Sequence, residues 1–355
     1  MKISRPYELL SRDKNIPLNK TAGRFYFEKF IHTFHKDDKY FSALFGYNNP
    51  SPEDKQHIFK KFVCIINLET NAYCNRTCGY CPLSFFDRKS KNPKHFKEIS
   101  ITDGLFSKII DELAQIHYAS TISLNLYNEP LSDIHLFKRI AEIKSKLPDV
   151  FLRFNSNGDL LDKPTLERLA DSGLDSINIT LHTLKNEVYN DKKSQTKIER
   201  FYHRLALPLP ELQINENKNI TSSLQIGNLL MLVNTSNWGA FGNDRGGGIK
   251  ELSIQGRTQP CPKVFREMNI DYLGNVFLCC NIFPDDPKNK PLGNLNEHSL
   301  FEIFASKKLA KFRQHLFDFS EKMSPCATCN EESFDDGRSN HDNVLEKIKQ
   351  GASFE

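Results

Sequence analysis

Three cysteines in the stretch NAYCNRTCGYCPLS, residues 71–84, have the type and spacing needed to bind a metal cluster. Cys74, Cys78 and Cys81 follow one another as Cys-x3-Cys-x2-Cys. Iron–sulfur clusters bind thiolates, and a four-iron cluster takes four ligands. Three thiolates this close can each bind a different iron of one cluster, which leaves the fourth iron open to another ligand. Zinc is the alternative, but a zinc site needs a fourth ligand nearby and usually pairs its cysteines as Cys-x2-Cys.

The spacing of these cysteines resembles the signature of the radical S-adenosylmethionine (SAM) enzymes. Tyr80, the aromatic residue directly before the third cysteine, fits the same pattern. The resemblance implies that the amino and carboxylate groups of SAM bind the open iron. It also implies that the reduced cluster cleaves SAM to a 5′-deoxyadenosyl radical, and that a flavodoxin- or ferredoxin-type donor supplies the electron.

A second group of cysteines lies near the C-terminal end. Cys261 and Cys279 bracket an expected β-hairpin, NIDYLGNVFLC, and Cys326 and Cys329 follow as Cys-x2-Cys. These four resemble the ligands of a twitch domain, the short form of the SPASM domain, which implies a second, auxiliary [4Fe–4S] cluster. Four thiolates in two pairs also suit structural zinc. Four cysteine ligands leave no iron open, so an auxiliary cluster here would accept or relay an electron.

Composition excludes several other classes of protein. The 48 Lys and Arg residues and 44 Asp and Glu residues nearly balance at a formal charge of +4, which does not predict a nucleic-acid-binding face. The N-terminal stretch lacks the apolar region of a signal peptide, and no apolar run reaches the ~20 residues of a membrane helix. The nine cysteines fall in tight groups, which favours metal ligands in a reducing compartment over a disulfide framework. We therefore expect a cytoplasmic protein without a nucleic-acid or membrane partner.

The elements that must position these cysteines alternate along the chain. Alternating strands and helices predict a parallel sheet with right-handed crossovers, here with about five or six units instead of the eight of a closed TIM barrel. The radical SAM resemblance implies an α/β fold, a partial (β/α)6 TIM barrel with a small C-terminal hairpin and helix domain. We expect strands at 62–69, 121–127, 150–158, 175–182 and 223–234, and helices at 101–116, 132–147 and 163–173. The expected domains are an extension at 1–60, the barrel at 61–250, the auxiliary domain at 251–335 and a tail at 336–355.

Polar residues stand where the expected strands end, and in such barrels the chemistry belongs at these ends. The sequence YNEP, residues 127–130, has the position of the family's GGE-like motif, where Glu129 would accept hydrogen bonds from the SAM ammonium group. The expected SAM-binding residues are Tyr80, Asn128, Glu129, Ser156, Asn157, Asn178, His182 and Leu230.

Two further residues are candidates for contact with the substrate. Arg245 lies in the glycine-rich segment NDRGGG, and its planar guanidinium group suits an anionic or hydroxyl-bearing partner. Cys280 follows a predicted cluster ligand, so in a strand its side chain would point to the opposite side. It is either a hydrogen-atom donor to a substrate radical or a buried apolar residue. Cys64, in the apolar run of the first strand, is expected in the core.

These features lead to one main functional hypothesis and two alternatives. The resemblance implies hydrogen abstraction from a small cyclitol- or sugar-like metabolite, followed by dehydrogenation or epimerisation. Epimerisation or cross-linking of a ribosomally made peptide is the first alternative, although the first sixty residues are too few for the usual peptide-recognition domain. A non-catalytic zinc-binding scaffold is the second.

Overall fold

A computed structural model describes residues 38–84, 99–183, 187–254, 256–330 and 346. Three histidines of the sequence outside the expected sites, His32, His35 and His341, lie outside these residues, as does almost all of the expected tail.

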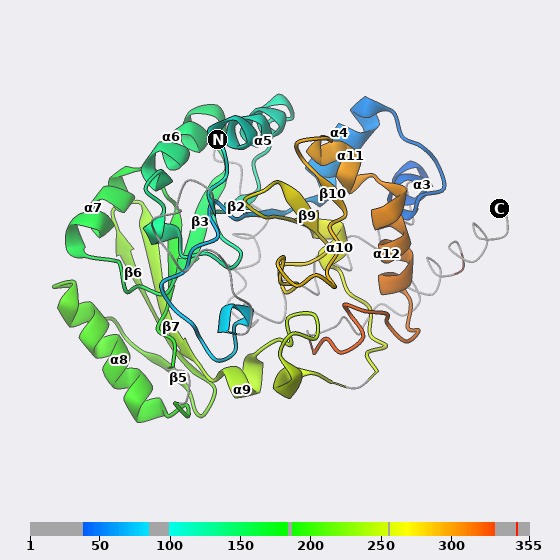
Figure 1. The fold of residues 1–355 in the computed structure, drawn as a ribbon. Helices are drawn as coiled ribbons and strands as arrows, with labels where there is room; N and C mark the ends of the chain where they lie inside the picture. The colour runs from blue at the N-terminus through cyan, green and yellow to red at the C-terminus, as the bar shows by residue number, and fades with distance from the viewer. Residues whose placement is uncertain (1–37, 85–98, 184–186, 255, 331–345, 347–355) are drawn as a thin grey trace.

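One sheet of ten strands organises the described part of the chain, in the order β10-β9-β8-β1-β2-β3-β4-β7-β6-β5 (Figure 1). The six strands from β8 to β7 pair in parallel, and the strands at both edges pair antiparallel. The strands are β1 (Ile65–Leu68), β2 (Thr121–Ser123), β3 (Phe151–Ser156), β4 (Ser176–Thr180), β5 (Gln213–Asn215), β6 (Asn219–Ile226), β7 (Leu229–Ser236), β8 (Glu267–Ile270), β9 (Asn275–Phe277) and β10 (Gly293–Asn294).

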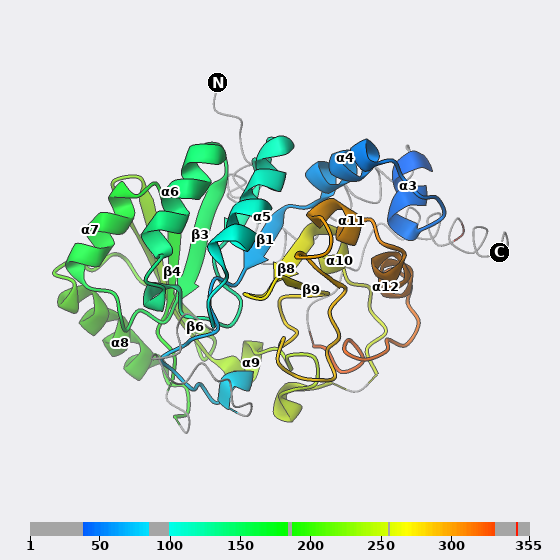
Figure 2. The same cartoon turned by 45° about the horizontal axis from the view of Figure 1, so that its top comes forward.

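Four helices lie outside the parallel strands and bury one apolar face each against them (Figures 1 and 2). Three of them begin at a residue whose side chain caps the helix: Thr102 accepts a hydrogen bond from the backbone N–H of Leu105, and Asp162 and Asn190 cap two others in the same way. Three of these helices were predicted, but the fourth falls in a polar segment to which the sequence assigned no element. The helices are α5 (Asp103–Gln115), α6 (Leu136–Lys146), α7 (Lys163–Asp171) and α8 (Asp191–Arg204).

Two expected elements differ in the structure. The single strand expected at 223–234 is a hairpin of β6 and β7, because the backbone turns at Gly227 with a φ of +57°. The single helix that the sequence suggests at 299–317, between Cys279 and Cys326, is broken at Ser306, whose side chain caps the second piece. The two pieces are α11 (Leu300–Phe304) and α12 (Lys307–Phe317).

The described end of the N-terminal extension packs on the auxiliary part. Helices α3 (Asp38–Phe45) and α4 (Pro52–Phe62) lie against α12 and α11, and none of their residues reaches the central cavity described below (Figure 2). The fully buried Arg313 of α12 joins this region, because its guanidinium donates to the carbonyl groups of Leu44, Val264 and Phe304. The remaining short helices are η1 (Pro82–Ser84), η4 (Pro130–Ser132), α9 (Trp238–Phe241), η5 (Lys250–Leu252) and α10 (Lys263–Arg266).

Candidate active site

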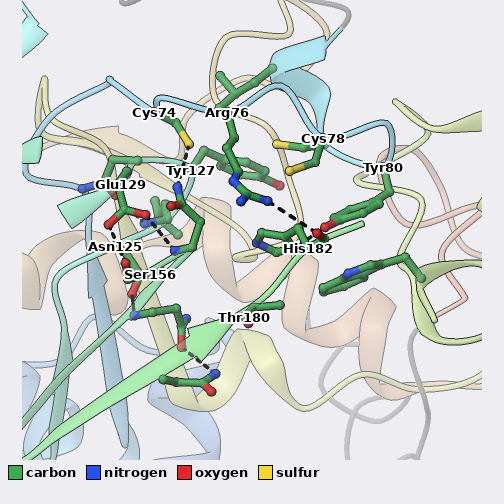
Figure 3. Close-up of a pocket in the computed structure, with 18 of the residues that line it drawn as sticks. Cys74, Arg76, Cys78, Tyr80, Asn125, Tyr127, Glu129, Ser156, Thr180 and His182 are labelled. Carbon is green, nitrogen blue, oxygen red and sulfur yellow. Dashed lines mark hydrogen bonds between the residues drawn. The ribbon is translucent and has the colours of Figure 1, made fainter. Parts of the chain in front are cut away.

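A cavity of about 270 Å³ lies at the carboxyl ends of β2, β3 and β4 (Figure 3). Parallel α/β sheets place their chemistry at this edge. The cysteine loop after β1 forms one side of the cavity, and the segments that follow β2, β3 and β4 form the others. The predicted residues that line it are Cys74, Cys78, Cys81, Tyr80, Asn128, Glu129, Ser156, Asn157, Asn178, His182 and Arg245.

The three thiols of this loop are half-buried. Burial raises the pKa of Cys74 to about 12 and that of Cys78 to about 11. Because iron binds the thiolate, cluster assembly must release these protons. The side-chain amide of Asn157 lies 3.9 Å from the Cys74 sulfur, so the loop already has a polar neighbour for one thiolate.

Three aromatic rings close one wall of the cavity. Tyr80 stacks on Trp238 with ring centroids 4.5 Å apart and an interplanar angle of 17°. The Tyr80 hydroxyl also forms a hydrogen bond with Nδ1 of His182. Burial, followed by the charge of Arg76, lowers the pKa of His182 to about 3, so this imidazole is neutral at physiological pH. The wall therefore offers flat, uncharged surfaces against which an adenine or another ring can stack.

Glu129 is the buried carboxylate of the cavity and is 2% exposed. One carboxylate oxygen accepts hydrogen bonds from the Ser156 hydroxyl at 2.8 Å and the Leu131 N–H at 3.1 Å. The other accepts from the Asn157 N–H at 2.8 Å and has a lone pair to spare. Burial raises the pKa of Glu129, while these donors oppose that rise. Glu129 therefore holds the loop after β3 in shape and can still accept one donor from a ligand.

A row of asparagine side chains forms the floor. The Asn234 amide donates to Asn178 at 2.8 Å, and the Asn178 amide donates to Asn155 at 3.1 Å. Asn125 accepts from the backbone N–H of Asn155 at 2.9 Å. Primary amides both donate and accept, so this floor suits a ligand rich in hydroxyl groups. Asparagines 125, 128, 155, 157 and 178 line the cavity.

Tyr127 lies between the two cysteine groups. It packs with Leu83 and Phe283 in a small apolar cluster that also touches Cys74 and Cys81. The Arg245 guanidinium lies 5.8 Å from the centroid of the Tyr127 ring and donates to Asn281, two residues after Cys279, at 2.9 Å. One tyrosine and one arginine thus connect the central cavity to the segment that carries the second cysteine group.

The four predicted ligands of the auxiliary cluster come from distant segments of the chain and line one small cavity together. Asn243 donates a side-chain N–H to the Cys329 sulfur at 3.5 Å, and the buried Arg257 donates to the same sulfur at 3.4 Å. The backbone N–H of Asn281 points to the Cys279 sulfur at 3.3 Å. Such N–H···S contacts favour the thiolate and tune the potential of a cluster. The four residues of this cavity are Cys261, Cys279, Cys326 and Cys329.

The glycine-rich segment is a structured loop. The fully buried Asp244 accepts from the N–H groups of Gly246 and Gly247, and from the Thr328 hydroxyl at 2.6 Å. Arg245 itself has a φ of +55°, a left-handed conformation that a non-glycine residue adopts only when its surroundings enforce it. Asp244 therefore fixes Arg245 between the cavity and the second cysteine group.

Two residues that were predicted to contact SAM or the substrate lie outside the central cavity. Leu230, expected at the SAM adenine, pairs with Ser176 at the far end of β7, so this prediction is wrong in its placement. The error follows from the hairpin, which starts the parallel strand later than the apolar run suggested. Cys280 lines neither cysteine cavity, and its sulfur lies 3.8 Å from Nζ of Lys263.

Sequence reasoning also missed several residues of the cavity. Arg76 lies within the cysteine loop itself, but one arginine in a polar loop carries no periodic signal. Trp238 is the single tryptophan of the chain, and that rarity alone could have marked it as a candidate. In the structure its half-buried ring lies on the aromatic wall. The missed lining residues are Arg76, Leu83, Asn125, Leu126, Asn155 and Trp238.

Comparisons with known families now bear on this geometry. The family model of the radical SAM superfamily matches residues 68–206, and that of the SPASM iron–sulfur cluster-binding domain matches residues 261–330. The chain therefore carries a radical SAM domain followed, toward the C-terminus, by a SPASM iron–sulfur cluster-binding domain. Its cofactors are SAM and [4Fe–4S] clusters, and the predicted enzyme class is confirmed. No helix in the described part of the chain is both long and apolar enough to cross a membrane.

Two relatives and one solved structure illustrate the relationship. An S-adenosyl-L-methionine-dependent 2-deoxy-scyllo-inosamine dehydrogenase of Niallia circulans is 24% identical over 272 residues, which cover 76% of this chain and 94% of the relative. A GTP 3′,8-cyclase of Sulfurimonas denitrificans is 32% identical over 136 residues, 37% of this chain and 38% of the cyclase. The crystal structure of BtrN in complex with AdoMet and 2-DOIA matches with a TM-score of 0.55 at 21% identity, over 77% of this chain and 94% of that chain. This match confirms the predicted α/β fold with its small C-terminal domain.

Proposed function

We propose that this radical SAM enzyme dehydrogenates a small hydroxylated metabolite, a cyclitol or a sugar-like compound. In this proposal Cys74, Cys78 and Cys81 bind the SAM-cleaving cluster. The second set of four cysteines binds the auxiliary cluster, and the residues around Glu129 and Asn157 hold SAM. The carrying observation is that four thiols from distant segments share one cavity, which is the ligand number of a closed, electron-accepting cluster.

The reaction balances as a two-electron oxidation of an alcohol. When bound, SAM and the reduced cluster supply a 5′-deoxyadenosyl radical. Oxidation of the alcohol would remove one hydrogen atom from the substrate carbon, one proton from its hydroxyl group and one electron, and the cluster held by Cys261, Cys279, Cys326 and Cys329 would supply the acceptor for that electron. The product is a ketone. Arg245 and the amides of the floor orient the substrate hydroxyl groups, while the aromatic wall excludes water.

Two observations favour dehydrogenation over epimerisation. Epimerisation needs a hydrogen-atom donor at the substrate, and Cys280 was the candidate. Its thiol is not among the groups that line the central cavity, and it neighbours Lys263. The Niallia circulans relative, which covers most of this chain, is named as a dehydrogenase of a hydroxylated amine. An external reductant, a small protein of the flavodoxin or ferredoxin type, completes the proposal.

The test is anaerobic iron and sulfide counting beside product analysis. The reduced enzyme, with SAM and 2-deoxy-scyllo-inosamine as the first probe among cyclitols, is expected to form 5′-deoxyadenosine and a ketone in equal amounts. We expect roughly eight irons in the parent and roughly four when Cys74, Cys78 and Cys81 are all changed to Ala, since each cluster holds four. Cys64→Ala is the matched control, because Cys64 is buried in the core.

Each component of the proposal has its own refuting result. Four irons and one zinc in the parent would remove the electron acceptor. Loss of product in Cys280→Ala, with an epimer in the parent, would replace dehydrogenation by epimerisation. Turnover of a peptide and of none of the cyclitols would refute the substrate class.

A further inference from the structure

The cysteine loop carries an arginine that reaches out of the loop. Nε and Nη2 of Arg76 bind the two oxygens of Asp159, at 2.6 Å and 2.5 Å. Asp159 directly follows the turn after β3, so the pair joins two loops 83 positions apart in the chain. A planar guanidinium that binds both carboxylate oxygens fixes orientation as well as distance. Figure 3 shows Arg76 reaching across the cavity beside Cys74 and Cys78.

Further hydrogen bonds brace both ends of this ion pair. Asn75 donates to Asp159 at 3.1 Å and accepts from the side chain of Asn157 at 2.7 Å. On the other side, Arg204 of α8 donates to the carbonyl oxygens of Gly158 at 2.5 Å and Asp159 at 3.2 Å. The turn that presents Asp159 is therefore itself held in place by a helix of the barrel.

Arg76 also contacts the end of β4. Its Nη1 donates to the carbonyl oxygen of His182 at 3.4 Å. One side chain thus connects the cysteine loop to the ends of two neighbouring strands. The loop has little regular structure of its own, although one backbone hydrogen bond joins Cys81 to Cys78. Such a loop loses considerable conformational entropy when it is ordered, so external ties matter to its shape.

We propose that the Arg76–Asp159 pair is a positioning clamp, which keeps the cysteine loop ordered before any cluster is bound. The inference rests on the proposed assignment of Cys74, Cys78 and Cys81 as ligands. The clamp orders the loop in the apo-protein, so less conformational entropy is lost when the first cluster is assembled. Once bound, the cluster itself cross-links the loop, and the clamp then matters less.

Hydrogen–deuterium exchange of residues 72–84 tests the clamp without any turnover. Arg76→Gln and Asp159→Asn remove the ion pair with little change in size, and Asp159→Glu retains the carboxylate. Asp111→Asn is the matched control, because it removes the carboxylate of the Lys146–Asp111 pair, 2.6 Å long and likewise partly exposed. Full-length protein is compared before and after anaerobic reconstitution, and the electron paramagnetic resonance spectrum of the reduced cluster is recorded with and without SAM.

In the apo-protein we expect hydrogen exchange in the loop to be about tenfold faster in Arg76→Gln and Asp159→Asn, because each variant loses one charge-assisted hydrogen-bonded pair. Cluster assembly should slow in the same two variants, while Asp159→Glu and Asp111→Asn stay near the parent. After reconstitution, exchange and spectrum should return to parental values. Exchange at the parental rate in both variants would overturn the clamp. If exchange is parental and the spectrum no longer responds to SAM, Arg76 would be a SAM ligand and not a clamp. Faster exchange in a protein whose first site takes up no iron would support the clamp and refute the ligand assignment.

Discussion

Replacing Glu129 by Gln tests how much of the SAM site depends on one buried carboxylate. The parent carboxylate accepts three hydrogen bonds, from Ser156, Leu131 and Asn157, at 2.8–3.1 Å. Glutamine has nearly the same shape, but one acceptor oxygen becomes an NH₂ group. Whichever way the amide turns, at least one of these donors faces another donor, and the remaining hydrogen bonds lose their charge assistance.

The magnitude follows from these contacts. A hydrogen bond to a charged group contributes about 1.5–3 kcal/mol, and a buried donor left without an acceptor costs about 1–3 kcal/mol. Rotation of the Ser156 hydroxyl offsets part of this loss. We therefore expect Glu129→Gln to lower the free energy of unfolding by about 2 kcal/mol. We expect it to weaken SAM binding by at least the ~30-fold that corresponds to 2 kcal/mol, because the ligand ammonium group also loses its acceptor.

The assay pairs calorimetric titration of SAM with chemical denaturation, both on reconstituted protein under anaerobic conditions. Glu112→Gln is the control, since Glu112 is a mostly buried carboxylate that accepts the Leu300 N–H at 2.8 Å, remote from the cavity. It should lose stability but bind SAM as the parent does. If Glu129→Gln unfolds at the parental denaturant concentration and binds SAM with parental affinity, the carboxylate neither stabilises the fold nor binds SAM, and the reasoning is refuted.

Three further changes probe the framework around the two cysteine groups. Arg313→Met leaves three buried carbonyl groups without their donor and should cost about 4 kcal/mol of unfolding free energy, measured by denaturant titration. Gly158→Ala places a Cβ 2.8 Å from Ile179 at a φ of +74° and should cost about 3 kcal/mol and weaken SAM binding in calorimetry. Arg257→Gln removes a cation that donates to the Cys329 sulfur, so redox titration should show a more negative potential for the auxiliary cluster only. An unchanged potential there would contradict Cys329 as a cluster ligand.

The cysteines of the cavity could be predicted from the sequence because their chemistry is local. Cys74, Cys78 and Cys81 need only a short loop to meet at one cluster, and the spacing alone predicts that. Glu129, Ser156 and Asn157 could be placed because they lie at or shortly after the ends of two strands, β2 and β3, whose apolar pattern is clear. The order of strands and helices then brings those ends to one edge of the sheet.

Long-range packing set the parts that the sequence did not predict. Trp238 reaches the aromatic wall through a short helix after β7, and no pattern in the sequence relates it to Tyr80. The segment 223–234 looks like one strand because apolar residues continue on both sides of Gly227 and Asn228, and the positive φ of Gly227 marks the turn that separates the two strands. Cys280 was assigned by strand alternation, yet β9 ends at Phe277, so alternation no longer describes the residues that follow.

The auxiliary domain is joined to the barrel by strand pairing as well as by the chain. Strand β8 pairs in parallel with β1 over four residues, with Leu68 opposite Ile270, and this pairing continues the barrel sheet. The cysteine loop follows β1, and Cys279 follows the hairpin that β8 forms with β9. A single strand pairing therefore sets the separation of the two cysteine groups, and Tyr127 and Phe283 fill the space between them with an edge-on contact at 5.0 Å. Because electron transfer to an auxiliary cluster depends on a constant separation, a shared sheet serves it better than a flexible connection between two domains would.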